Sequence, residues 1–274
     1  MLPVWAETYP MKISTTFRKI VRHPGIKLWA VLLWLGVWLL AYKLINEDRR
    51  DLLLSSPIQV GQNLWHLVKT PEYWERVLFS SRKVMTGMLA GAVLGTVLGT
   101  CAFFVPFIKE LFRPLISVIR SIPVVSFIVL AVYWIGYVDL GRFIAFLICL
   151  PVFYSNTLSG LGAADKNLLE MAKVFRFGFF RKFTAVYLPA LVTHLFAAGE
   201  VAVGLAWKSG TAAEFIAYVS TVRSVGAALY NAKKDLLTAE LLSWTVTIVV
   251  LSALFSLVFR LLLRLATRRW GVGK

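Results

Sequence analysis

Residues 170–189 have the sequence EMAKVFRFGFFRKFTAVYLP, a basic and partly apolar segment that lies between two long apolar runs. Apolar side chains recur in and just before it at helical spacing, while basic side chains fill the other faces. The apolar positions are Leu168, Ala172, Phe175 and Phe179, and the basic ones are Lys173, Arg176, Arg181 and Lys182. The segment is too polar to cross a bilayer, so its apolar stripe needs another surface to cover it.

The composition predicts an integral membrane protein. Of the 274 residues, 58% are hydrophobic, and the mean hydropathy is +0.72. The net charge of +16 would suggest a nucleic-acid partner in a soluble chain. In a membrane protein it more often reflects cytoplasmic loops that lie near anionic lipid headgroups, and we favour this interpretation.

The sequence offers little chemistry for an enzyme. Cys101 and Cys149 lie in apolar runs and are expected to be packing residues, and the three histidines lack metal-ligand spacing. No phosphate-binding G-x-x-x-x-G-K-[ST] motif occurs, so we expect that this chain does not itself hydrolyse ATP. We therefore expect no catalytic set, no bound cofactor and no metal.

The apolar runs predict an all-α polytopic protein with six transmembrane helices, near residues 26–45, 84–104, 114–135, 143–161, 191–207 and 237–263. The predicted organisation is a cytoplasmic arm (1–25), a first transmembrane helix (26–46), an external amphipathic segment (47–82), a core domain (83–266) and a cytoplasmic tail (267–274). The first run is expected to be an uncleaved anchor, and Met1 and Met11 both stay open as the true start. Basic residues favour cytoplasmic termini, although the external side also carries several.

Two features of the predicted spans concern packing and shape. Gly87, Gly91, Gly95 and Gly99 follow each other at steps of four, which places them along one helix face and allows a close helix approach. We favour packing within the chain over a face that borders a transport pathway or a second copy. Pro123 is expected to kink the third span.

In the external segment, Ser56-Pro57 and Pro71 predict the starts of two short helices with an aromatic, interfacial face.

Several side chains are candidates for a gate or a solute pathway. Glu200, Lys208 and Glu214 lie in or beside the fifth apolar run, where a charge needs a partner or water. We expect a break at Ser209-Gly210 that lets Lys208 approach Glu214, as a structural pair or as part of a gate, whereas Glu200 has no evident partner. Further candidates are Arg120, either a boundary anchor or a gate residue, and the aromatic pair Trp134 and Trp207.

The segment that includes Glu170, Ala172, Leu188 and Pro189 resembles the cytoplasmic coupling loop of ABC importer permeases. The resemblance extends over residues 56–270, including FRPLISVIRSIPVVSFIVLAVYWIG and GLAWKSGTAAEFI, and is greatest for the branch that handles nitrate, sulfonates and taurine. It implies a type I importer permease fold, a coupling loop at about 162–189 that docks on an ATPase subunit, a second permease copy and an external solute-binding protein. The coupling residues it implies are Glu170, Met171, Ala172, Phe175, Arg176, Gly178, Leu188 and Pro189.

One position departs from the family pattern. The family has glycine six residues after the glutamate, where this chain has Arg176, and glycine permits the positive φ of a turn that ends a helix. Either the turn moves to Phe177-Gly178 or the two helices join differently.

The rival hypothesis is a stand-alone secondary carrier or channel that uses Glu200 as an ion or proton site. Such proteins usually have repeated halves with matched broken helices. The sequence predicts a break near Gly210 and no counterpart in the first half, which favours the importer subunit.

Overall fold

The structure is a computed structural model that describes residues 24–45 and 52–270, with side chains for 29–45 and 52–261. The predicted arm (1–25) lies almost entirely outside these residues, as do the choice of start and the end of the predicted tail. Within the described ranges every regular element is a helix, so the predicted all-α class is confirmed.

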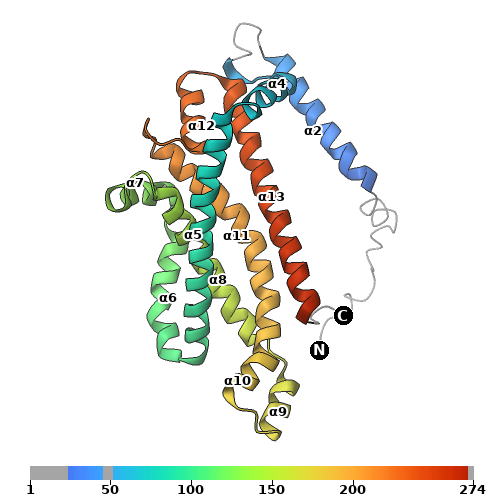
Figure 1. The fold of residues 1–274 in the computed structure, drawn as a ribbon, viewed down its shortest axis with the longest axis vertical. Coiled ribbons are helices and arrows are strands. Elements are labelled where there is room, and N and C mark those ends of the chain that lie inside the picture. The colour runs from blue at the N-terminus through green and yellow to red at the C-terminus, as the bar shows by residue number, and fades with distance from the viewer. Residues whose placement is uncertain (1–23, 46–51, 271–274) are drawn as a thin grey trace, which may run out of the picture.

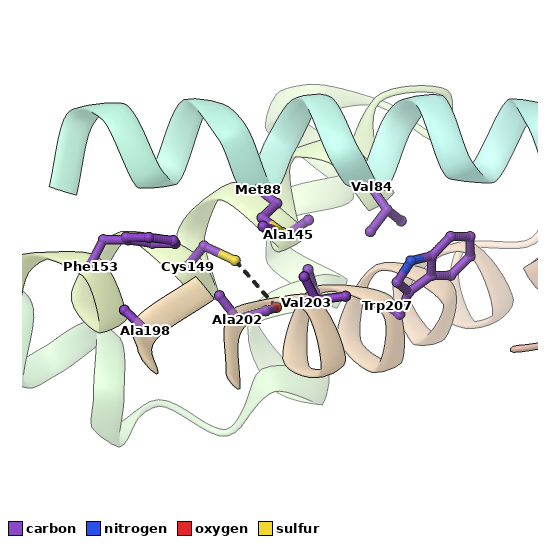
Figure 2. Packing of buried hydrophobic residues seen from close by; sticks show 10 residues of the cluster. Val84, Met88, Ala145, Cys149, Phe153, Ala198, Ala202, Val203 and Trp207 are labelled. Carbon is purple, nitrogen blue, oxygen red and sulfur yellow. Dashed lines mark hydrogen bonds between the residues drawn. The ribbon is translucent and has the colours of Figure 1, made fainter. Parts of the chain in front are cut away.

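Three long helices form the centre of the molecule: α5 (Pro71–Phe104), α8 (Leu140–Gly162) and α11 (Leu188–Ile216). The contact between α5 and α8 is the most extensive in the chain, and that between α8 and α11 is the next. The largest buried cluster lies among these helices (Figure 2), and it includes Val84, Met88, Ala145, Cys149, Phe153, Val203 and Trp207. Cys149 is buried there and Cys101 is exposed, and both are free thiols.

The remaining long helices cover one side of this centre (Figure 1). Helix α13 (Thr238–Trp270) packs against α11, whereas α2 (Pro24–Leu44) leans away from the body and contacts α4 (Pro57–Val68). Helix α12 (Val225–Lys234) lies at the same end of the molecule as α4 and packs against α11 and α13. The opposite end is formed by α9 (Lys166–Val174) and α10 (Phe179–Lys182).

The predicted third span is not one straight helix. Helix α6 (Pro106–Ser121) and helix α7 (Val124–Ile135) meet at an angle of 109°, with Ile122 and Pro123 between them. Proline has no amide proton and its ring excludes a continuous helix, so the predicted kink at Pro123 is confirmed, as a sharp bend between two helices. Helix α6 also includes Lys109, Glu110 and Arg113, so it begins before the predicted span near residue 114.

Four helices in the described ranges are long and apolar enough to cross a membrane: α5, α8, the unit from Phe179 to Ile216, and α13. The bent pair α6–α7 gives a fifth span if it is counted as one, and the described part of α2, Trp29–Leu44, is a shorter apolar helix. These helices support a polytopic membrane protein, and the count of six transmembrane helices stays a prediction.

The external segment divides differently from the prediction. Ser56 and Gln59 cap the start of α4 reciprocally, with N···O distances of 2.8 and 3.2 Å, so the predicted start at Ser56-Pro57 is confirmed. Pro71, however, begins a single helix that continues to Phe104, because Arg82 and Lys83 are compatible with helix and no glycine or proline interrupts the boundary at 82–83. Trp65 and Trp74 are exposed as expected, whereas Tyr73 is buried against Trp244.

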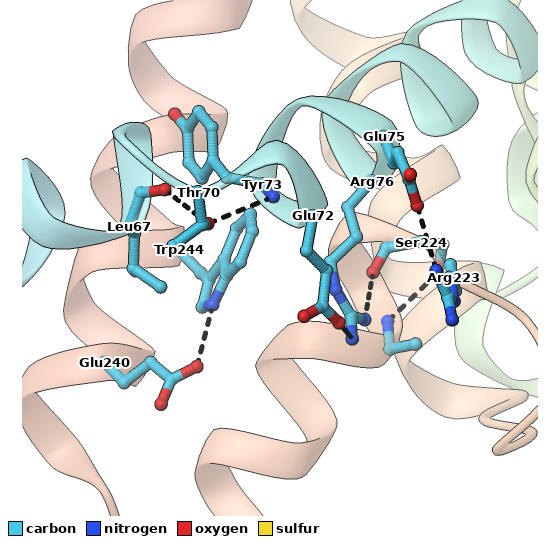
Figure 3. Close-up of polar contacts among 11 residues, drawn as sticks. Leu67, Thr70, Glu72, Tyr73, Glu75, Arg76, Arg223, Ser224, Glu240 and Trp244 are labelled. Atoms are coloured by element: carbon cyan, nitrogen blue, oxygen red, sulfur yellow. Dashed lines mark hydrogen bonds and ion pairs between the residues drawn. The ribbon is translucent and has the colours of Figure 1, made fainter.

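Helix α11 is also longer than predicted, because it passes through Ser209-Gly210 without a break. Gly210 allows close packing instead: a Cβ there would lie 2.7 Å from a methyl group of Val84 on α5. The helix ends at Ile216, and the loop that follows is held to the start of α5 by Arg223–Glu75 (3.0 Å) and by Arg76, which donates to the Ser224 carbonyl at 3.5 Å (Figure 3).

Candidate functional site

The α9–α10 end of the molecule contains the predicted coupling residues. Asp165 caps α9 by accepting from the Asn167 amide at 2.8 Å. Ala172, on the opposite side of the helix from solvent, is 2% exposed and packs with Ala164 and Val186. Ala172 is therefore a packing position within the chain, and the predicted apolar stripe does not form one outward face.

The turn after α9 is centred on Arg176, which has a φ of +51°. The Phe177 amide donates to the Ala172 carbonyl (2.8 Å) and the Arg176 amide donates to the Lys173 carbonyl (3.0 Å), which is the hydrogen-bond pattern of a Schellman motif. The turn thus stays where the family has glycine, so the first of the two alternatives, a shift to Phe177-Gly178, does not occur. Gly178 has a φ of −64° and begins α10 instead.

We predict that Arg176→Gly strengthens this turn. A residue with a side chain in the left-handed region costs about 1 kcal/mol relative to glycine, so the end of α9 should become more protected from amide hydrogen exchange. Gly178→Ala is the matched control, because nothing lies within 4 Å of the added Cβ and its φ is ordinary. Unchanged or faster exchange at Phe177 in Arg176→Gly would contradict the prediction.

Leu188 and Pro189 shape the connection from α10 to α11. A π-helical turn, η2 (Phe183–Tyr187), precedes them, and the Leu188 amide donates to the Phe183 carbonyl five residues earlier. Pro189 has no amide proton to extend the ordinary pattern and sits in the first turn of α11, where proline is tolerated. Leu188 and Pro189 therefore join α10 and the π-helical turn to the long central helix α11 without a loop.

Aromatic rings tie this end to the central helices. Phe104, the last residue of α5, lies 5.4 Å from Phe179 and 5.5 Å from Tyr187, measured between ring centroids. Phe103 lies 5.8 Å from Tyr187. A displacement of α10 would therefore press directly on the end of α5.

Other apolar side chains at this end are uncovered. Phe180 is 83% exposed and Val174 is 79% exposed. The remaining exposed apolar members are Leu168, Met171, Phe175 and Phe179. Basic side chains surround them, and Arg181 stacks over Phe177 at 4.4 Å. We call this set the α9–α10 patch, and its mixture of aromatic and basic side chains is typical of a protein interface.

Glu200 has an ion-pair partner in the structure. Its carboxylate pairs with Arg260 of α13, and both side chains are about half exposed. Arg260 lies near the end of the last predicted span, 237–263. Sixty positions separate the two in sequence, so periodicity within one helix could not pair them.

Glu214 lies at a junction of four helices and does not pair with Lys208. Its Oε2 accepts from the Ser80 hydroxyl of α5 at 2.7 Å and from the Gly226 amide of α12 at 3.2 Å. Gly141 of α8 makes room for the carboxylate, since a Cβ there would lie 3.2 Å from Oε1. Lys208 is exposed, and its predicted approach to Glu214 is wrong because α11 does not bend between them.

Glu214→Ala is expected to destabilise the fold by about 2–3 kcal/mol, because it leaves the buried Ser80 hydroxyl and the Gly226 amide without their acceptor. The melting temperature in lipid nanodiscs should fall by roughly 5–10 °C. Glu214→Gln should lose less, since an amide oxygen still accepts both bonds. Lys208→Ala, a change on the same helix, should stay close to wild type. Equal melting temperatures for Glu214→Ala and Lys208→Ala would refute this role.

The other gate candidates lie far apart. Trp207 is fully buried in the central cluster, 5.4 Å from the Phe255 ring, and thus lines no surface of this chain. Trp134 on α7 is 68% exposed. Arg120 donates to the Pro151 carbonyl at 3.0 Å and to the Ser155 hydroxyl, so it holds the end of α6 against α8.

The glycine series on α5 faces α8. A Cβ on Gly91 would lie 2.6 Å from the Phe146 carbonyl oxygen, and one on Gly95 would lie 2.5 Å from the Leu150 carbonyl oxygen. Gly87 and Gly99 meet the α8 backbone in the same way. The packing role that we favoured from the sequence matches this arrangement.

Among the residues that the structure describes, no group of three or more His, Cys, Asp or Glu side chains is arranged to hold a metal ion. The ion pairs found in these ranges involve two or three side chains. The group of three joins α5 to the α7–α8 turn, where Lys83 donates to Asp139 at 2.6 Å and an Arg142 nitrogen lies 3.2 Å from the same Asp139 oxygen. The hydrogen bond from Lys83 outweighs partial burial and lowers the pKa of the Asp139 carboxyl, so this turn stays ionised at neutral pH.

Comparison with known proteins identifies the fold. Residues 87–272 match the family described as the binding-protein-dependent transport system inner membrane component. The chain belongs to this family. The permease is 29% identical to the putative aliphatic sulfonates transport permease of Escherichia coli (strain K12), covering 74% of this chain and 76% of that one. It is 26% identical to a nitrate import permease of Leptolyngbya laminosa (66% and 67% covered) and 23% identical to the taurine transport permease of E. coli (79% and 80%).

These relatives confirm the resemblance to ABC importer permeases of the nitrate, sulfonate and taurine branch, and with it the type I importer fold class of a multi-pass membrane protein. Proteins of this kind are transport components and are not themselves enzymes. Sequence reasoning missed the contact partners of the Glu214 and Glu200 carboxylates, namely Ser80, Gly226 and Arg260. Each becomes significant only through a contact with a distant helix.

Proposed function

We propose that this permease is the membrane-spanning subunit of an ATP-driven importer and that the α9–α10 patch is its docking site for a separate ATPase subunit. The observation that carries the proposal is a group of exposed aromatic and aliphatic side chains, above all Phe180 and Val174, on a segment too polar to lie within lipid. Exposed apolar side chains outside a bilayer favour a protein partner.

The proposal includes an orientation. The α9–α10 end faces the cytoplasm, the termini are cytoplasmic, and the α4–α12 end faces outward across the inner membrane, where an external solute-binding protein delivers the solute. Two copies of the permease form the pathway between them. ATP binding draws the ATPase subunits together, and the short helices transmit this movement through Phe104 and Tyr187 into α5 and α11.

The names of the relatives support a proposal about the class of solute. The names of three of them specify aliphatic sulfonates, nitrate and taurine, which all carry an oxyanion. We propose that this permease transports a small solute with such a group.

Reconstitution tests the function. The permease is placed in liposomes with its ATPase and binding protein, and uptake of labelled nitrate, taurine and an alkanesulfonate is followed. Uptake of at least one solute should require ATP on the α9–α10 side and the ATPase subunit. Transport that proceeds without the ATPase and follows an ion gradient would establish a secondary carrier instead.

A charge swap separates the importer from the rival carrier that uses Glu200. Glu200 is paired with Arg260, and in the described ranges the broken pair α6–α7 has no matched broken counterpart. We expect Glu200→Arg alone to reduce uptake strongly, because it leaves two cations together in the membrane. The double variant with Arg260→Glu should recover at least half of the wild-type uptake. A carrier that needs a carboxylate at position 200 would stay inactive in the double variant.

A further inference from the structure

A groove lies between α6 and α8, in the half of the molecule that carries the α9–α10 patch (Figure 1). Its volume is about 500 Å³, and its walls include Lys109, Arg113 and Arg120 from α6 and Tyr154 and Ser155 from α8. The three cations are spaced by four and seven residues, so they follow one face of α6. This volume is within the range of sites that hold small ligands or parts of larger ones.

The groove carries more positive charge than its own side chains neutralise. Glu110 is the one carboxylate in its walls, and it lies 3.7 Å from Arg113 in a pair that is largely exposed. Arg120 is already occupied by the Pro151 carbonyl and the Ser155 hydroxyl. Lys109 makes no ion pair with any residue that the structure describes. The groove as a whole therefore has a net charge of about +2, and its Lys109–Arg113 end has a net charge of about +1, which favours an anion.

Apolar side chains flank these cations. Phe107, Leu111, Leu115 and Val118 on the neighbouring faces of α6 are each at least half exposed. In a membrane-embedded chain such faces are covered by acyl chains, and the cations beside them lie where the helix begins, near the polar boundary. Basic pockets of this kind between transmembrane helices are suited to anionic headgroups.

We propose that the groove between α6 and α8 binds an anionic phospholipid, with the headgroup phosphate held by Lys109 and Arg113 and the acyl chains lying along Leu111 and Leu115. This proposal does not depend on the proposed transport function. It requires only that the chain is embedded in a bilayer. The phosphate oxygens accept from Lys109, which has no ion pair among the described residues, and from Arg113, whose exposed pair with Glu110 spans 3.7 Å. Arg120 keeps the two walls of the groove together.

The test compares full-length permease, with any subunits that co-purify, in nanodiscs of phosphatidylcholine alone or mixed with phosphatidylglycerol. Phosphatidylglycerol should raise the melting temperature of the wild type by several degrees. The variant K109Q/R113Q should lose most of this gain and retain about tenfold less phosphatidylglycerol in native mass spectrometry. The charge-preserving K109R/R113K should restore both. K233Q/K234Q, which removes the same charge at the α12 end, should respond like wild type.

Two outcomes would overturn the proposal. An equal gain in wild type and K109Q/R113Q would show that the lipid acts elsewhere. Stabilisation of the wild type but not of K109Q/R113Q by methanesulfonate or nitrate in phosphatidylcholine alone would assign the groove to a free solute. Neither result bears on whether an ATPase drives transport, because no nucleotide and no uptake enter the measurement.

Discussion

Gly91→Leu should abolish the recovery of folded protein. The first atom of any side chain at this position meets the α8 backbone, 2.6 Å from the Phe146 carbonyl oxygen and 3.1 Å from the Leu150 amide nitrogen. Backbone atoms cannot rotate away as a flexible side chain can, so α5 and α8 must separate. Because this contact is the most extensive in the fold, we expect the loss to exceed about 4 kcal/mol, well above an ordinary substitution.

Two further variants test whether the loss of folded protein depends on the size of the side chain and on its position. Gly91→Ala should lower the melting temperature in nanodiscs by several degrees without preventing folding. Gly61→Ala on α4 is the matched control, because nothing lies within 4 Å of its added Cβ, and alanine favours helix by about 1 kcal/mol. It should be neutral or stabilising. A Gly91→Leu protein that melts like wild type would show that α5 does not pack on α8 through this face.

Phe180→Ala should weaken capture of the ATPase subunit at least 30-fold and reduce ATP-driven uptake in parallel. Removal of one aromatic anchor at the centre of an interface costs about 2–4 kcal/mol, and Phe180 is 83% exposed, so little of this loss can come from packing within the chain. Affinity is measured between the permease in nanodiscs and the purified ATPase. Phe175→Ala should act in the same direction.

Trp65→Ala is the control for Phe180→Ala. Trp65 is a large aromatic residue, 63% exposed, at the opposite end of the molecule. Its removal should leave ATPase affinity unchanged. Wild-type affinity in both Phe180→Ala and Phe175→Ala would exclude the α9–α10 patch as the docking surface. Ala172→Glu is a poorer test, because Ala172 is buried and a glutamate there would disrupt α9 itself.

The sequence was informative wherever a local pattern determines structure. Glycines at steps of four predicted a close helix contact, Pro123 predicted a kink, and Ser56-Pro57 predicted a helix start. The family resemblance depended on Glu170, Leu188 and Pro189, whose spacing is also local. These features need no knowledge of what lies across the fold.

The errors arose where distant contacts decide the outcome. The sequence predicts a helix break at Gly210 because glycine disfavours helix, but in the structure its lack of a side chain admits Val84 of another helix. Glu214 was expected to meet the nearest lysine, whereas its partners lie on α5 and α12. Arg176 adopts a conformation usual for glycine because the Schellman hydrogen bonds and the buried Ala172 fix the end of α9.

The central claim is that the α9–α10 patch receives a motor subunit at the cytoplasmic face. A photo-crosslinking amino acid in place of Phe180, in membranes of cells that contain the whole transporter, tests it most directly, with the same group at Trp65 for comparison. Our account predicts that position 180 forms an adduct with a nucleotide-binding subunit and that position 65 does not. Adducts from position 180 only to lipid, to this chain or to an external protein would contradict it.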